Sequence, residues 1–127
     1  MRRLAALPLL LVFPFCACAP KAEAPPPPAP LALDCATPFE AQVAKITAQP
    51  YLVAAPREPG EPYRFYSTAG GAVSYVITEQ DAPGHPAILM QTAAGGQVKT
   101  TGCPYGDHKG YQQVLAYIDS LKTAAKR

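Results

Sequence analysis

Four cysteines and two histidines are the side chains of this 127-residue chain whose types could support metal or redox chemistry. Cys35 and Cys103 together with His85 and His108 would supply the thiolate and imidazole ligands of a Cys2His2 zinc site. Their spacing matches no standard zinc module, and an exported chain would favour a disulfide between the two cysteines. The sequence therefore predicts no metal and no other cofactor.

Motifs for catalysis are missing from the sequence. No serine lies in a G-x-S-x-G elbow, and no P-loop, dinucleotide fingerprint or H-E-x-x-H motif occurs. The most polar, glycine-containing corner contains Tyr105, Asp107 and His108, directly before a predicted helix whose free amides attract anions. Two interpretations stay open for this corner: a small ligand site, or a tight turn in which Asp107 caps the helix. We expect a protein without enzymatic activity.

The N-terminus has the pattern of a secretory signal. A cationic start, Met1-Arg2-Arg3, precedes an apolar run from Leu4 to Phe15. This run is shorter than the roughly 20 residues that cross a bilayer, and Pro8 and Pro14 would break a buried helix. A positive start followed by a short apolar run is typical of a signal peptide, which we predict over residues 1–17.

Phe15-Cys16-Ala17-Cys18 resembles the lipobox of bacterial lipoproteins, in which an apolar residue at −3 and a small residue at −1 precede an invariant cysteine. The resemblance implies cleavage before Cys18 and acylation of this cysteine, with palmitate-type chains that together anchor a protein stably in a membrane. Ala19 is not the aspartate associated with inner-membrane retention, which implies the outer membrane, facing the periplasm. Ordinary signal cleavage after Ala19 is the alternative.

Residues 18–33 are predicted to be the lipidated cysteine and a proline-rich linker. The four consecutive prolines Pro25–Pro28 favour a polyproline II spacer. At about 3.1 Å per residue, the stretch from Ala19 to Leu33 could hold the domain up to about 47 Å from the membrane. Pro25–Pro28 also satisfies the PxxP docking pattern, but a spacer is the simpler interpretation.

Charge excludes one class of partner. The chain has 11 basic and 9 acidic residues. Arg2 and Arg3 would leave with the signal peptide, so the mature chain would be formally neutral. A nucleic-acid-binding protein would show a basic face or run, and this sequence has neither.

Residues 34–127 are predicted to form a single small domain that contains one disulfide. Cys16 would leave with the signal peptide and Cys18 would carry lipid, so Cys35 and Cys103 remain as a pair in an oxidising compartment. Their bond would close a loop of roughly 70 residues and stabilise the domain by about 4 kcal/mol in the chain-entropy model.

The hydrophobic periodicity of this domain predicts an α+β fold. Thr37-Pro38-Phe39-Glu40 has the pattern of a capping box that starts a helix ending by Gln49. Four strands are predicted at 63–68, 72–78, 87–92 and 97–101, before a last helix that Asp107 caps. The short connections imply an antiparallel meander. We expect both helices on one face of this sheet.

All seven tyrosines lie in the domain, and Tyr63, Tyr66 and Tyr75 fall on the first two predicted strands. Neighbouring residues of a strand point to opposite faces, so some of these rings should lie on the sheet face without helices. Tyrosine is enriched in protein interfaces because it joins a large apolar area to a polar tip. These three residues are therefore the candidate partner surface.

We therefore expect a non-enzymatic, lipid-anchored cell-envelope protein whose small domain binds an unknown envelope protein or polymer. One alternative is a periplasmic inhibitor of a lytic enzyme, which would use a protruding loop at residues 57–62 or 81–86. A second is a small-ligand or metal-binding accessory, or a hydrolase, which would need a pocket that joins His85 or His108 to a carboxylate such as Asp107.

Overall fold

Five antiparallel strands follow one another in chain order, β1-β2-β3-β4-β5, and form one sheet. The computed structural model describes residues 11, 12, 14, 16, 18 and 29–125. Its elements are α1 (Phe39–Thr47), β1 (Leu52–Ala54), β2 (Tyr63–Thr68), η1 (Ala69–Gly71), β3 (Val73–Thr78), β4 (Ala87–Ala94), β5 (Gln97–Pro104) and α2 (His108–Ala125). The predicted α+β class and antiparallel meander are confirmed, with one strand more than the four expected.

Most of the predicted signal peptide and linker lies outside the described residues. Phe15 and Ala17 of the lipobox are among the residues outside, whereas Cys16 and Cys18 are described as exposed free cysteines. Within the described ranges, no helix has the length and apolar character that crossing a membrane requires.

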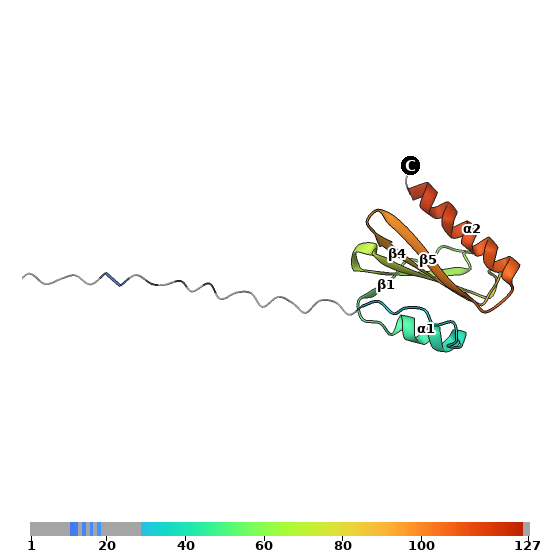
Figure 1. The fold of residues 1–127 in the computed structure, drawn as a ribbon, viewed down its shortest axis with the longest axis horizontal. Coiled ribbons are helices and arrows are strands. Elements are labelled where there is room, and N and C mark those ends of the chain that lie inside the picture. Colours follow the sequence, from blue (N-terminus) through green and yellow to red (C-terminus); the bar gives the residue numbers. More distant parts are fainter. Residues whose placement is uncertain (1–10, 13, 15, 17, 19–28, 126–127) are drawn as a thin grey trace, which may run out of the picture.

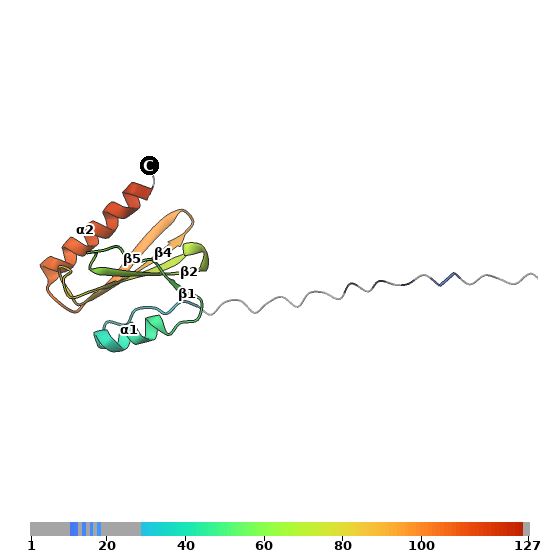
Figure 2. The ribbon, with the colours of Figure 1, turned by 180° about the vertical axis from the view of Figure 1, so that it is seen from behind.

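The two helices cover opposite faces of the sheet, which corrects the prediction that both lie on one face (Figures 1 and 2). On the α2 face, Val114 of the helix belongs to a core cluster with Val76 and Leu89 of the strands. On the α1 face, Ile46 of the helix belongs to a second cluster with Ile77. The sheet is therefore the middle layer of three.

The strand sequences explain this burial on both faces. β4 begins with Ala87-Ile88-Leu89-Met90, four buried apolar residues in succession, and β3 buries both Val76 and Ile77. A strand that is covered on one face alternates apolar and polar residues, whereas a strand that is covered on both faces is apolar throughout. The sheet therefore needs a helix on each side.

The additional strand is β1, a segment of three residues. It pairs with β2 in the register Leu52↔Thr68, Val53↔Ser67 and Ala54↔Tyr66. A segment this short carries too little periodicity for its pairing in a sheet to be predicted from the sequence.

The start of α1 differs from the predicted capping box. Pro38 is the N-cap and makes no side-chain cap hydrogen bond. The Thr37 hydroxyl instead donates to Asp34 Oδ2 at 3.2 Å, and Asp34 Oδ1 accepts the amide of Ala36 at 3.0 Å. Asp34 thus forms a turn through its side chain, which engages Thr37 before the helix begins.

The predicted disulfide and the predicted cap of α2 are both present. Cys35 and Cys103 are bonded, with their Cα atoms 5.1 Å apart, so the chain just before α1 is joined to the end of β5. Asp107 Oδ2 accepts the amide of Gly110 at 2.7 Å, as an N-cap side chain does.

Candidate functional site

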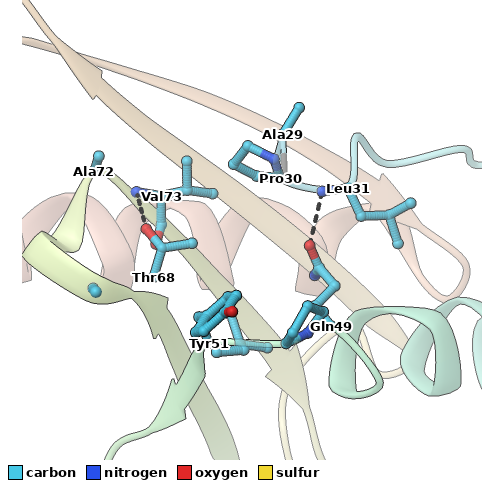
Figure 3. Close-up of a pocket in the computed structure, with 11 residues that line it drawn as sticks. Ala29, Pro30, Leu31, Gln49, Tyr51, Thr68, Ala72 and Val73 are labelled. Atoms are coloured by element: carbon cyan, nitrogen blue, oxygen red, sulfur yellow. Dashed lines mark hydrogen bonds between the residues drawn. The ribbon is translucent and has the colours of Figure 1, made fainter. Parts of the chain in front are cut away.

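An open pocket of about 460 Å³ lies where the chain enters the domain (Figure 3). Its walls come from the entering chain, the end of α1, β1 and the β2–β3 connection. The lining residues are Ala29, Pro30, Leu31, Gln49, Pro50, Tyr51, Leu52, Thr68, Ala69, Ala72 and Val73. None of these residues is charged, and most are apolar, so the pocket suits an apolar group.

Hydrogen bonds hold the entering chain in place as one wall of the pocket. Gln49 Oε1 accepts the amide of Leu31 at 2.8 Å, and Gln49 Nε2 donates to the Ile46 carbonyl at 3.1 Å. The Tyr75 hydroxyl donates to the Leu31 carbonyl at 2.7 Å, and burial raises the pKa of Tyr75. Leu31 and Leu33 also pack against the α1-face core, so the end of the predicted linker contacts the domain.

The sheet supplies the opposite wall, and its one hydroxyl is already bonded. Leu52 and Thr68 are paired across β1 and β2. Thr68 Oγ1 accepts the amide of Val73 at 3.2 Å and lies 3.3 Å from the Val73 carbonyl, to which it donates. A ligand in the pocket would therefore meet mainly aliphatic groups on this side.

Tyr51 is an exposed aromatic residue that lines the pocket (Figure 3). Its side chain is in large part solvent-accessible, with 73% of the residue surface exposed. Its φ of 67° lies in the left-handed region, which is uncommon for bulky residues and costs about 1–3 kcal/mol. This conformation lies between the end of α1 and β1. Because strained backbone conformations cluster at functional sites, this φ makes Tyr51 a candidate contact residue.

β1 is an edge strand whose outer side pairs with no other described strand. The amide of Ala55 donates to the Phe65 carbonyl at 2.9 Å, which fixes the direction of the backbone groups along this pair of strands. Because the direction alternates in antiparallel pairing, Val53 turns its backbone groups toward β2, whereas Leu52 and Ala54 turn theirs outward. Among the described residues, no hydrogen bond reaches these outward groups.

The predicted tyrosine surface is not formed. Tyr63 and Tyr75 are 7% and 0% exposed, and Tyr66 is half-buried. Tyr63 stacks on Tyr117 of α2 with ring centroids 5.0 Å apart, while Tyr66 and Tyr75 belong to the α1-face core. The reason is the placement of the helices: each covers one face, so the sheet has no open face for these rings.

The polar groups of the predicted ligand corner serve the fold. The Tyr105 hydroxyl donates to the Thr37 carbonyl at 2.7 Å. Asp107 caps α2, and His108 is the exposed first residue of that helix. These contacts favour the interpretation as a turn and helix cap over a ligand site.

The residues considered for a zinc site are not free to act together. Cys35 and Cys103 are bonded to each other. His85 Nδ1 lies 2.9 Å from the Thr78 hydroxyl, and its ring packs edge-on against Phe39 at a centroid distance of 5.4 Å. In the part of the chain that the structure describes, no three His, Cys, Asp or Glu side chains are grouped to hold a metal ion.

Both loops considered for an inhibitor are held against the domain. In residues 57–62, Glu61 Oε1 accepts the Tyr117 hydroxyl at 2.7 Å. In residues 81–86, a β-carbon on Gly84 would overlap the backbone at the start of α2, so the loop lies directly on that helix. Residues 57–60 of the first loop are nevertheless exposed at the surface.

Sequence reasoning did not single out Tyr51 and Leu52, although one signal was available. Pro50 and Pro56 bracket a short apolar stretch, and proline beside a strand is typical of sheet edges. Edge position alone does not predict a pocket, because its walls come from segments far apart in the chain.

No protein-family model, curated protein or solved structure matches this chain.

Proposed function

We propose that this chain is a non-enzymatic, lipid-anchored protein of the bacterial cell envelope whose small domain binds another envelope component. Lipid on Cys18 would anchor it in the outer membrane, facing the periplasm, and the proline-rich linker would hold the domain at a distance. The observation that carries the binding role is the uncharged, open pocket beside β1, lined in part by the exposed Tyr51 ring.

The composition of this pocket supports a role in binding. Charged residues are depleted in the cores of protein interfaces, whereas tyrosine is enriched among the residues that dominate binding energy. None of the described lining residues is charged, and Tyr51 among them is 73% exposed. Val53, on the other face of the same edge strand, is 59% exposed. Burial of these side chains by a partner would remove apolar surface from water, which favours association.

The anchor can be tested with two matched cysteine substitutions. Cells that express the chain are fed a clickable palmitate analogue, and the label on the protein is measured after separation on a gel. Cys18→Ser should abolish the label and leave the precursor uncleaved, whereas Cys16→Ser should leave labelling unchanged. Equal labelling of both variants would refute lipidation at Cys18, and separation of inner and outer membranes then locates the labelled protein.

The binding role can be tested by photo-crosslinking in intact cells. A photo-reactive phenylalanine analogue replaces one exposed apolar residue at a time: Tyr51, Val53, Val98 or Leu121. A discrete crosslinked species from at least one position is expected, because a partner must cover some part of the surface. Absence of a crosslink from every position would contradict the proposed binding role.

A further inference from the structure

We propose that the free outer side of β1 pairs with an extended segment of a partner protein, and that one uncharged apolar side chain of this segment enters the adjoining pocket. This inference rests on the proposed binding role and specifies the surface and the chemistry of the partner. It is drawn from the backbone directions in β1 and from the pocket lining taken together.

The backbone of β1 offers hydrogen-bonding groups at the correct positions for strand addition. The N–H and C=O groups of Leu52 and Ala54 point outward and have no partner among residues 29–125. An added antiparallel strand would exchange two hydrogen bonds with each of these residues. Strand addition to a sheet edge gains affinity from such main-chain bonds and specificity from side-chain pockets.

The same register determines which residue of an added strand would face the pocket. Residues that face each other in a hydrogen-bonded pair project their side chains to the same face, with Cα atoms about 5.5 Å apart. Leu52 projects to the α1 face, where it lines the pocket. The partner residue opposite Leu52 would therefore project into the pocket mouth. Its neighbours in the partner strand would project to the other face, where Val53 is 59% exposed.

The lining of the pocket decides the chemistry of this side chain. All the lining residues that the structure describes are uncharged, so a carboxylate or ammonium group would lose hydration without gaining a counter-charge from them. An aliphatic side chain such as leucine loses no hydrogen bond there and buries apolar surface. The fitting partner is thus an extended segment with an uncharged apolar residue at the central position.

The size of β1 argues for a segment of another protein rather than a second copy of this chain. β1 has three residues, of which two offer outward backbone groups. A symmetric contact between two such short edges would fall well below the roughly 1,000 Å² that a stable interface needs. A flexible extended segment can instead follow the edge and fill the pocket at the same time.

The opposite edge of the sheet lacks these features. β5 is longer, with eight residues, but the groove beside it is lined by Asp119 and Lys122, which are charged. Lys99 also lies on this edge strand, and a lysine on an edge opposes strand addition. β5 therefore serves as the internal control for the edge that is proposed to bind.

The test uses the mature chain from Cys18 to Arg127 with Cys18→Ser, labelled with nitrogen-15. The probes are end-capped heptapeptides of serine and threonine with leucine, serine or glutamate at the centre, titrated during two-dimensional NMR. The leucine peptide should shift the amide signals of Leu52 and Ala54 most strongly. The serine peptide should bind at least about tenfold more weakly, since the apolar burial is lost, and the glutamate peptide should not bind.

Two variants separate edge pairing from pocket filling, and a third variant is their control. Ala54→Pro removes an outward N–H that β2 does not use, and Ala72→Leu places a side chain in the pocket; each should abolish the shifts at Leu52. Val98→Pro makes the matched change on β5. The alternating hydrogen bonds between β4 and β5 leave the backbone groups of Val98 pointing outward, as those of Ala54 do. This control variant should leave peptide binding unchanged. The spectrum of each variant shows whether it is folded. If Ala54→Pro does not fold, Ala72→Leu still tests the inference.

The other outcomes would overturn the inference. Shifts confined to β5, equal binding of all three peptides, or no binding would each reject β1 and the pocket as the docking site. Shifts at Leu52 that grow with protein concentration without peptide would indicate a second copy as the occupant. A crosslink in cells from Val98 or Leu121 alone would sustain the proposed binding role while rejecting this surface.

Discussion

Reduction of the Cys35–Cys103 disulfide should lower the free energy of unfolding by about 4.4 kcal/mol. The two cysteines are 68 positions apart in the chain. For a loop of this length, the chain-entropy relation gives about 15 cal/mol/K, or about 4.4 kcal/mol at 25 °C. Small domains have total stabilities of about 5–15 kcal/mol, so the oxidised and reduced proteins should differ widely in stability.

Urea denaturation of the oxidised and reduced mature chain measures this difference with identical side chains in both samples. Cys18→Ser removes the remaining thiol, and tyrosine fluorescence reports unfolding because the chain contains no tryptophan. With a urea dependence of about 1–3 kcal/mol/M, the midpoint should fall by about 1.5–4 M. The double variant Cys35→Ala/Cys103→Ala is the control and should not respond to reductant. A difference below about 1 kcal/mol would refute the loop-entropy reasoning.

The loss of stability should be uneven along the chain. α1 has nine residues and buries only Gln42 and Ile46, and a helix this short is marginal without packing. The disulfide joins the chain just before α1 to β5, whereas the 18-residue α2 has no such bond. Hydrogen exchange of the reduced protein should therefore accelerate more in α1 than in α2. Equal acceleration in both helices would show that the bond does not specifically hold α1.

Four further substitutions test individual contacts. Gln42→Leu should raise the free energy of unfolding by about 1 kcal/mol in urea denaturation, because the buried Gln42 Oε1 has no hydrogen-bond partner among the described residues. Gly102→Ala should lower it by about 1–3 kcal/mol, since a β-carbon there would overlap the Tyr111 hydroxyl; Tyr111→Phe in the same chain should restore part of the loss. The hydrogen bond to Glu61 and burial raise the pKa of Tyr117 from 10.0 to about 12, so the stabilisation from this hydrogen bond is present below pH 10 and is lost as the pH rises through 12. Tyr117→Phe should reduce the loss of stability over this alkaline range, and an unchanged profile would contradict that assignment.

The elements that the sequence predicts well are those with long periodic patterns or strong local signals. The apolar stripe of α2 and its cap at Asp107 both lie within one continuous segment, so the helix is recognisable without tertiary information. The disulfide was predictable because the predicted loss of Cys16 with the signal peptide and the predicted lipidation of Cys18 leave one pair of cysteines. By contrast, the side of the sheet on which each helix lies depends on contacts between distant segments, and Ala87–Met90 indicates only that both faces of β4 are buried.

The candidate site is harder to predict because its properties arise from assembly of the fold. Leu31 and Val73 are ordinary apolar residues in the sequence, and they form a pocket only when the entering chain lies beside the β2–β3 connection. The aromatic pattern led instead to Tyr63 and Tyr75, whose rings the helices cover. Tyrosine is a residue type typical of interfaces, so the sequence suggested a binding surface at these rings. The placement of the helices decided that the rings are buried.

The position of the pocket restricts where a partner can be met. Ala29 and Pro30 line the pocket and lie within the predicted linker, which extends to residue 33. With the proposed anchor at Cys18, a polyproline spacer from Ala19 to Pro30 would span at most about 37 Å. A segment bound along β1 would therefore contact the domain on the side where the linker arrives, within that distance of the membrane. This geometry favours a partner that is itself held near the membrane, since anchoring both proteins at one surface raises their effective concentration and allows a short edge strand to bind with useful affinity.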